Sequence, residues 1–479
     1  MIKATHRFLV LSAVFLALFF SSEAVLAQRC DADYEQIITF RSPDMGSYSV
    51  WDTVFGDEDK HELFQSALQL EDGDVLALGL RYARAGKDAQ EGVQKEQQIP
   101  AELILAQVRP NGRVRWRQFH RIEGLISVVK LLAVEDGYLV LGNRRQAQNG
   151  KPVIWMGLFD SLGGLKSQSD ISGAAGDLAY DITPWRRLNA KGQPYLSYLV
   201  AALAPDTPSS ARLYTLNSKR QVASRQDFVT GRENRILSLY PLEDEEAVLA
   251  SGYDYEDERK SGWILRLNKD GGIDWQQLYP RGAGAEVVKV KPYKKDYLIA
   301  VGTAAPAVDG GKQAGWVMLL RADNGELIWQ RYFTGALEFL GRDVLISPDG
   351  LISVLLDGVL PEDNEDESLQ EHVRLVTLNP RGVMFSADSY FNGEGTDAIG
   401  LLEGVRGQRI IIGATDMVHT IEDASMAAKA PEGVGAGTPD STQAEAAVKV
   451  LRSRDGWLAA AVPTDAYDDP CVKQYPVVK

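Results

Sequence analysis

Short segments of alternating apolar and polar residues recur along most of the chain, and each is followed by a short polar turn. The segment AELILAQV at 101–108 precedes a turn at Gly112, and the segment GWILRL at 262–267 precedes a turn at Gly271. Alternation of this kind is typical of β-strands, and a short turn rich in Asn, Asp and Gly between two strands predicts a hairpin. No stretch shows a convincing helical period. The pattern therefore predicts an all-β protein.

The clearest repeated unit is a glycine turn followed four residues later by tryptophan. It occurs three times, in the pairs Gly112 and Trp116, Gly271 and Trp275, and Gly325 and Trp329. Related turns without the aromatic residue lie at Gly164, Lys219 and Gly382. Successive turns are 52, 55, 52, 54 and 57 residues apart. A near-constant period of this length is typical of a repeat architecture.

A second repeated feature is a β-rich run that usually ends in glycine, about thirty residues before each turn. These runs end at or near Gly79, Gly142, the glycine-less segment 195–202, Gly252, Gly302, Gly358 and Gly413. Another apolar segment precedes each run, so every unit holds four predicted strands. Four antiparallel strands in about 50 residues, repeated about seven times, is the pattern of a β-propeller.

Partial units lie at both ends of the repeat region. Residues 35–54 predict a hairpin whose second strand contains Trp51, and residues 397–413 predict the first half of a unit. A late hairpin predicted at 448–462 would either complete that unit or pack beside the N-terminal hairpin. The ring is therefore predicted to be closed by strands from both termini, which removes exposed sheet edges. Seven four-stranded blades are expected, with eight as the alternative because two hairpins compete for one place.

The first 27 residues have the layout of a secretory signal peptide. Lys3 and Arg7 precede an apolar run at 8–20, and small residues suit a cleavage after Ala27. The run is short for a membrane span, which needs ~20 apolar residues. Residues 28–479 are therefore predicted to form one propeller domain without a transmembrane segment, located in the periplasm or secreted.

Two features of this predicted domain lie outside the repeat. Residues 423–446 are rich in Ala, Gly, Pro, Ser and Thr, which predicts a flexible insertion. Cys30 and Cys471 are the only cysteines, and an exported chain meets an oxidising compartment. A disulfide between them is predicted to join the two ends of the chain, which would stabilise the fold by ~4–5 kcal/mol through the unfolded state.

The formal net charge is −15, and it becomes −16 without residues 1–27 because that segment holds two basic residues and one acidic residue. A chain this acidic argues against nucleic acid or anionic lipid as the main partner, since both favour clustered Lys and Arg. The charge does not exclude sugars, peptides or other proteins as partners.

The turn-then-tryptophan unit resembles the repeat of quinoprotein-like (PQQ-type) β-propellers, in which a glycine turn and a tryptophan-bearing strand recur. The resemblance rests on the three Gly and Trp pairs given above and covers residues 35–462 as a loose pattern. It implies that the tryptophans pack between blades. Dehydrogenases of that group use a vicinal cysteine pair and a calcium site, and this chain has no vicinal cysteines. The resemblance is therefore closest to non-catalytic periplasmic members that act as assembly scaffolds of the outer membrane.

The sequence assigns no catalytic, cofactor-binding or metal-binding residue. Beyond the leader the histidines are His61, His120, His372 and His419, and no two have metal-ligand spacing. No HExxH, GxSxG or P-loop motif occurs. Acidic runs at 243–246, 254–258 and 362–367 are expected in loops, and they suit calcium only weakly because the EF-hand order is missing.

Two hypotheses about function follow. The first is a non-catalytic scaffold that contacts another envelope or secreted protein, with Tyr253 and Tyr255 as candidates for a binding loop. The alternative is a propeller enzyme, a hydrolase or lyase that acts on glycans or lactones with a metal in its axial channel. An enzyme should gather carboxylates or histidines with shifted pKa values in that channel.

Overall fold

The computed structural model describes the chain from residue 33 to residue 461 except for residues 41–45, 57–59, 84–99, 147–149, 172, 190, 206–208, 229–231, 243–245, 257–258, 306–311, 362–365, 367–368 and 423–447. The predicted signal peptide at 1–27, the insertion at 423–446 and the pairing of Cys30 with Cys471 all lie outside the described residues.

The described strands form seven sheets, numbered here as blades in chain order. Blade 1 holds β3 (Lys60–Gln69), β4 (Val75–Ala83), β5 (Pro100–Val108) and β6 (Val114–His120); blade 2 holds β7 (Leu125–Val134), β8 (Gly137–Arg145), β9 (Pro152–Phe159) and β10 (Leu165–Asp170). Blade 3 holds β11 (Leu178–Leu188), β12 (Pro194–Ala204), β13 (Ser210–Leu216) and β14 (Val222–Phe228); blade 4 holds β15 (Asn234–Leu242), β16 (Ala247–Glu256), β17 (Arg259–Leu267) and β18 (Ile273–Pro280). Blade 5 holds β19 (Ala285–Tyr293), β20 (Tyr297–Ala304), β21 (Ala314–Arg321), β22 (Leu327–Thr334) and the added β1 (Glu35–Thr39). Blade 6 holds β23 (Glu338–Ile346), β24 (Ile352–Val359), β25 (His372–Leu378) and β26 (Met384–Tyr390); blade 7 holds β27 (Thr396–Glu403), β28 (Arg409–Glu422), β29 (Val448–Ala461) and β2 (Ser49–Phe55).

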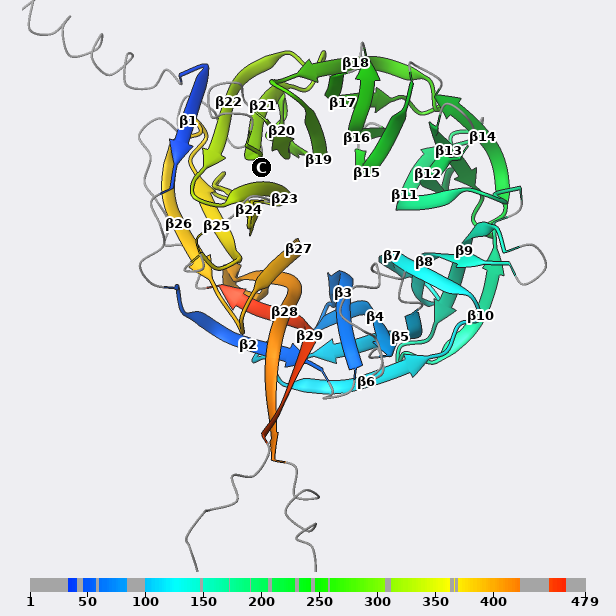
Figure 1. Ribbon diagram of the computed structural model, residues 1–479. Coiled ribbons are helices and arrows are strands. Elements are labelled where there is room, and N and C mark those ends of the chain that lie inside the picture. Colours follow the sequence, from blue (N-terminus) through cyan, green and yellow to red (C-terminus); the bar gives the residue numbers. More distant parts are fainter. Residues whose placement is uncertain are drawn as a thin grey trace, which may run out of the picture.

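The seven sheets surround one axis, which confirms the predicted seven-bladed, all-β propeller (Figure 1). The only helical element among the described residues is a 3₁₀ turn, Val405–Gly407. Burial explains the sequence pattern, since each sheet packs on both neighbours. In blade 2 almost every residue of the third strand β9 is buried, whereas most of the outer strand β10 is exposed. Central strands therefore read as apolar runs and outer strands as polar ones.

The recurrent glycines of the β-rich runs lie inside the second strand of a blade rather than at its end. Each faces a β-bulge in the first strand, where the bulged backbone comes unusually close. A Cβ atom added at Gly252 would lie 1.8 Å from the carbonyl oxygen of Arg235, and one at Gly302 would lie 1.9 Å from that of Glu286. Blade 6 differs, because Leu356 takes this position and Gly341 stands opposite it. Gly358 is thus not the structural equivalent of the other glycines.

We expect Gly252→Ala to lower the free energy of unfolding by about 2 kcal/mol, because the methyl group can fit only if the bulge shifts. Gly284→Ala is a matched control, since its Cβ would be in ordinary contact with Lys260 at 3.6 Å. Urea unfolding of both variants measures the difference. Equal stabilities would show that the bulge does not require glycine.

Ring closure differs from the predicted N-terminal hairpin at 35–54. Strand β1 pairs in parallel with β22 on the outer edge of blade 5, whereas β2 pairs antiparallel with β29 in blade 7. Phe40 accounts for the separation of the two strands. Its ring packs 5.7 Å from that of Phe333 and 5.1 Å from that of Phe339, which holds β1 against blade 5. The prediction that strands from both termini close the ring is confirmed, but the hairpin prediction is wrong.

The hairpin predicted at 448–462 is also wrong, because this segment is the single strand β29. Asp455 and Gly456 resemble a turn in sequence, yet β29 is paired with β28 throughout and with β2 from Gly456 onward. Gly456 packs against the ring of Phe64, from which an added Cβ would be only 2.8 Å away. Strand pairing and this close contact keep the backbone extended. With β2 as the fourth strand of blade 7, the count is seven.

Candidate functional site

The two faces of the ring differ in the length of their connections. Tight turns join first to second strands, as at Gly73, and third to fourth strands, as at Gly112. The opposite face carries the connections from second to third strands and between blades, including the longest ones, 84–99 in blade 1 and 423–447 in blade 7. We call this second side the long-loop face. Loops that carry binding function are typically built on such a rigid frame.

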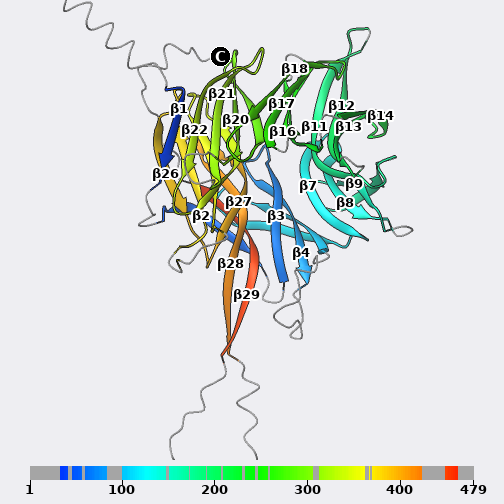
Figure 2. The same cartoon turned by 45° about the horizontal axis from the view of Figure 1, so that its top comes forward.

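A two-stranded ribbon extends from blade 7 at the long-loop face. Strand β28 pairs with β27 only over Arg409–Thr415, and β29 pairs with β2 only over Gly456–Ala461. Beyond these limits β28 and β29 pair only with each other, over Asp416–Glu422 and Val448–Arg454. These two segments are named the ribbon, and it reaches beyond the outline of the ring in both ribbon views (Figures 1 and 2). Both of its edges lack a neighbouring strand among the described residues.

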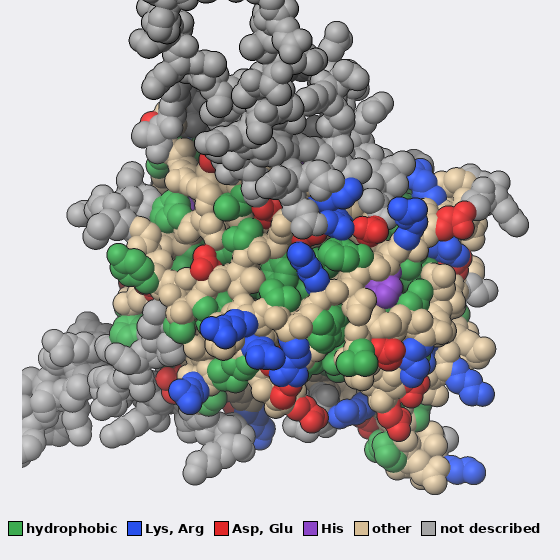
Figure 3. All heavy atoms as spheres, turned by 90° about the horizontal axis from the view of Figure 1, so that it is seen from below, with side chains coloured by type: hydrophobic (Ala, Val, Ile, Leu, Met, Phe, Trp, Pro, Cys, Tyr) green, Lys and Arg blue, Asp and Glu red, His purple; other side chains and the backbone are tan. Residues whose placement is uncertain are grey.

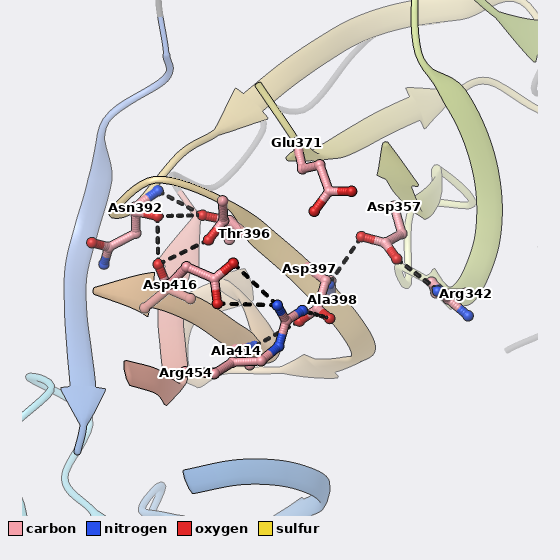
Figure 4. A network of polar contacts seen from close by, with 12 residues as sticks. Arg342, Asp357, Glu371, Asn392, Thr396, Asp397, Ala398, Ala414, Asp416 and Arg454 are labelled. Carbon is pink, nitrogen blue, oxygen red and sulfur yellow. Dashed lines mark hydrogen bonds and ion pairs between the residues drawn. The ribbon is translucent and has the colours of Figure 1, made fainter. Parts of the chain in front are cut away.

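Arg454 fixes the base of the ribbon (Figure 4). Its guanidinium pairs with the carboxylate of Asp416 across the ribbon at 3.1 Å and with that of Asp397 on β27. The Arg454 backbone N–H donates to His61 Nδ1 at 2.9 Å, which ties the ribbon to blade 1. Burial lowers the pKa of Arg454, but Asp397 and Asp416 raise it more, so the net pKa lies above the usual value. The arginine therefore holds three strands together as a permanent cation.

The loop between blades 6 and 7 binds the other side of the ribbon base (Figure 4). Asn392 accepts a hydrogen bond from the Thr396 hydroxyl at 2.7 Å and another from the Thr415 hydroxyl. The backbone N–H of Glu394 donates to the Asp416 carbonyl at 2.8 Å. This loop therefore continues the sheet pairing just before β27 begins at Thr396.

Asp357 connects the network to blade 6. Its carboxylate accepts from Arg342 at 2.6 Å and from the Ala398 backbone N–H at 3.2 Å. Burial raises the pKa of Asp357, although Arg342 acts in the opposite direction. The Glu371 side chain lies near Asp357 in Figure 4 and accepts from the Leu360 N–H at 3.3 Å. The network thus spans blades 6, 7 and 1 around one projecting element.

The axial channel is the second candidate site, with a cavity of about 340 Å³ lined by all seven first strands. The residue that follows the bulge in each first strand forms a ring around it, made up of Ser66, Lys130, Asp181, Ser238, Lys289, Asp343 and Gly400. We call these seven positions the channel belt. Polar side chains at bulge positions point where an enzyme of this fold would gather its groups.

The belt carboxylates are engaged in structural contacts. Asp181 pairs with Lys130 at 2.7 Å and accepts from the backbone N–H groups of Ile182 and Leu239 at 2.8 and 2.7 Å. Asp343 has the same arrangement, with Lys291 at 3.2 Å and the N–H groups of Val344 and Leu401 at 2.8 and 3.0 Å.

These contacts set the charge of Asp343. Burial raises its pKa, but Lys291, Lys289 and the two amides lower it more, so the net pKa lies below the usual value. A general acid needs a pKa near the working pH, whereas the lowered pKa of Asp343 keeps its carboxylate ionised.

The predicted repeat residues meet across blade boundaries. Each tryptophan contacts the turn glycine of the next blade rather than the glycine of its own turn. The distances from the ring to an added Cβ are 2.7 Å for Trp116 to Gly163, 2.7 Å for Trp275 to Gly325 and 3.0 Å for Trp329 to Gly382. Gly112 meets Trp51 in the same way, at 2.9 Å. Gly271 makes a looser contact, because its added Cβ would lie 3.8 Å from Trp185.

The candidate binding tyrosines lie in strand β16 and not in a loop. Tyr253 is 6% exposed, and its hydroxyl donates to Glu233 at 2.7 Å. The Lys260 amine lies 4.2 Å from the centre of the Tyr253 ring, and Tyr255 meets that ring edge-on at 5.8 Å. Burial and the Glu233 carboxylate raise the pKa of Tyr253. Little of Tyr253 is therefore available to a partner.

The described histidines make separate structural contacts. His120 donates through Nε2 to the Gly163 carbonyl at 2.7 Å, and His372 donates through Nδ1 to the Gln370 carbonyl at 3.0 Å. Within the described ranges no three His, Cys, Asp or Glu side chains are grouped to hold a metal ion. No helix of the described part of the chain is long and apolar enough to cross a membrane. On the face shown in Figure 3, hydrophobic side chains are scattered among charged ones.

Comparisons with known proteins find no family and only distant likenesses to solved structures. No family model matches the chain, and no curated protein matches it. The β-propeller domain of the Trilobed protease from Pyrococcus furiosus is 11% identical, over 74% of this chain and 90% of that chain, with a TM-score of 0.39. Sqt1 from Chaetomium thermophilum is 12% identical over 76% and 95%, with a TM-score of 0.39. Drosophila Plexin A, solved in complex with Semaphorin 1b, is 9% identical over 77% and 86%, with a TM-score of 0.42. Similarity at this level carries no argument about what the propeller does.

Proposed function

We propose that this propeller is an exported, non-catalytic scaffold that binds another envelope or secreted protein through the ribbon. The observation that carries the proposal is that the two edges over Met417–Glu422 and Val448–Arg452 have no neighbouring strand among the described residues. A two-stranded ribbon is marginally stable in water when it is isolated. The outward N–H and C=O groups of strand edges without a neighbour are a ready template for an added strand from a partner.

The anchoring network supports a role in recognition. Arg454, Asp416 and Asp397 hold the ribbon base in one orientation relative to three blades. A partner therefore meets an element whose base is already ordered, and less conformational entropy is lost on binding.

The channel supports the scaffold over the alternative enzyme acting on glycans or lactones. Asp181 and Asp343 are each bound to a lysine and two backbone amides. Carboxylates used in this way hold neighbouring blades together. Export to the periplasm or outside the cell is part of the proposal and rests on the leader-like residues 1–27 and the two cysteines. The likeness to PQQ-type scaffold propellers is consistent with it but rests on the repeat residues alone.

The proposal predicts that a partner is lost when the ribbon is removed. The test is affinity capture from the native envelope with three forms of the full chain. These are the wild type, a variant that replaces 423–447 by a short glycine turn, and a variant that replaces 417–453 in the same way and keeps Arg454 with Asp416.

We expect the first two forms to capture the same stoichiometric protein and the third to lose it, with unchanged thermal unfolding of the ring. Capture that is lost already in the second form would assign binding to the connection instead. Capture that persists in the third form would refute the role of the ribbon.

A further inference from the structure

The charges of the axial channel do not balance. Three lysines line the cavity, Lys130, Lys289 and Lys291, but the only carboxylates among its described lining residues are those of Asp181 and Asp343. Lys130 pairs with Asp181 at 2.7 Å, and Lys291 pairs with Asp343 at 3.2 Å. One positive charge therefore remains in a protein whose net charge is −15.

Lys289 carries this remaining charge. Its amine donates to the Ser238 hydroxyl at 3.3 Å, and no carboxylate of the described residues lies within ion-pair distance of it. It acts on Asp343 only at longer range, where it helps to lower the pKa of that carboxyl.

Lys289 also opposes the charge of Lys130. Burial lowers the pKa of the Lys130 amine, and repulsion from Lys289 lowers it further, although Asp181 raises it. Two like charges that face one cavity are costly unless an opposite charge lies between them. A negative group bound beside Lys289 would therefore reduce the repulsion between the two lysines.

We propose that the axial channel binds a small anion, with Lys289 as its charge partner and Ser238 as a neighbouring hydrogen-bond donor. The ligand is either a free inorganic anion or the carboxylate or phosphate group of a small organic molecule. A cavity of about 340 Å³ admits both, since it lies at the lower end of the ~300–1,000 Å³ range of small-molecule sites. The proposal is independent of the ribbon, which lies outside the channel.

Isothermal titration of the full-length protein with inorganic phosphate and, separately, with acetate tests the site. We expect one site per chain and at least about tenfold weaker binding for Lys289→Gln, because a charge-assisted hydrogen bond is lost. Lys269→Gln is the matched control, since it removes the same charge from an exposed turn of blade 4. Phosphate should also raise the midpoint of thermal unfolding of the wild type but not of Lys289→Gln.

The two probes distinguish the sources of the anion. Binding of phosphate alone indicates a phosphate group, and binding of both probes indicates a site for small anions in general. If Lys289→Gln does not fold, Lys289→Met replaces it in both measurements. Equal binding by wild type and the Lys289 variant, or no binding to the wild type at millimolar concentrations, overturns the proposal.

Discussion

Replacing Arg331 by alanine should lower the free energy of unfolding by about 4 kcal/mol, since several buried acceptors lose their donor at once. Arg331 is 1% exposed and donates to four backbone carbonyls. These belong to Gly382, Arg381, Asp33 and Gln330, at 2.7 to 2.9 Å. The side chain thus joins the outer strand of blade 5 to the turn of blade 6 and to the segment before β1. Burial lowers the pKa of this guanidinium, and the four carbonyls replace the hydrogen bonds that it would make to water.

Urea unfolding of Arg331→Ala beside Arg321→Ala separates this effect from the loss of any arginine. Arg321 lies in the same blade, but its side chain is 51% exposed and pairs with an exposed glutamate. We expect less than about 0.5 kcal/mol for the control. A similar small loss for Arg331→Ala would mean that its carbonyl partners are satisfied in another way.

Replacing Glu62 by glutamine should stabilise the protein by about 3 kcal/mol at pH 8 and have little effect near pH 4.5. Glu62 is fully buried between blades 1 and 7. Arg81 Nε lies 3.0 Å away, but this arginine is shared with Glu102, so its charge does not offset the cost of burying a second carboxylate. Burial raises its pKa from 4.5 to about 7, and Asp455 adds to the rise while Arg117 opposes it. Glutamine imitates the protonated form, which the folded protein prefers.

The direction of the pH dependence follows from proton binding. Between pH 4.5 and 7 the folded chain keeps the Glu62 proton that the unfolded chain has lost. The stabilising contribution of protonated Glu62 is therefore complete below pH 4.5 and declines as the pH rises to about 7. Unfolding curves of wild type and Glu62→Gln at several pH values isolate it, and Glu102→Gln, which removes the other carboxylate beside Arg81, is the control. A difference between wild type and Glu62→Gln that does not change with pH would contradict this account.

The repeat made most of the fold readable from the sequence. Bulges and tight turns impose residue types, so glycines such as Gly252 and Gly325 recur at the blade period. The arrangement of the N-terminal strands could not be predicted in the same way, because β1 and β2 are adjacent in sequence but pair with different blades. Nothing local in 35–54 indicates that separation, since contacts of Phe40 with blades 5 and 6 decide it.

The candidate sites were less predictable. Arg454, Asp416 and Asp397 come together only when blade 7 is assembled, and their sequence spacing gives no signal. The channel belt, in contrast, does leave a signal in the sequence. Lys130, Asp181, Ser238, Lys289 and Asp343 follow one another at intervals of 51, 57, 51 and 54 residues, the same period as the turns. A polar residue that recurs at this period within apolar strands indicates a ring around the axis.

Site-specific photo-crosslinking can show directly whether the ribbon contacts a protein partner. A photoreactive residue placed at successive positions of Met417–Glu422 is compared with one at Leu162, which is 70% exposed on a turn of blade 2. In the native envelope we expect the ribbon positions to yield one defined crosslinked species and Leu162 to yield none. Crosslinks of equal yield from both places, or none from the ribbon, would contradict the account.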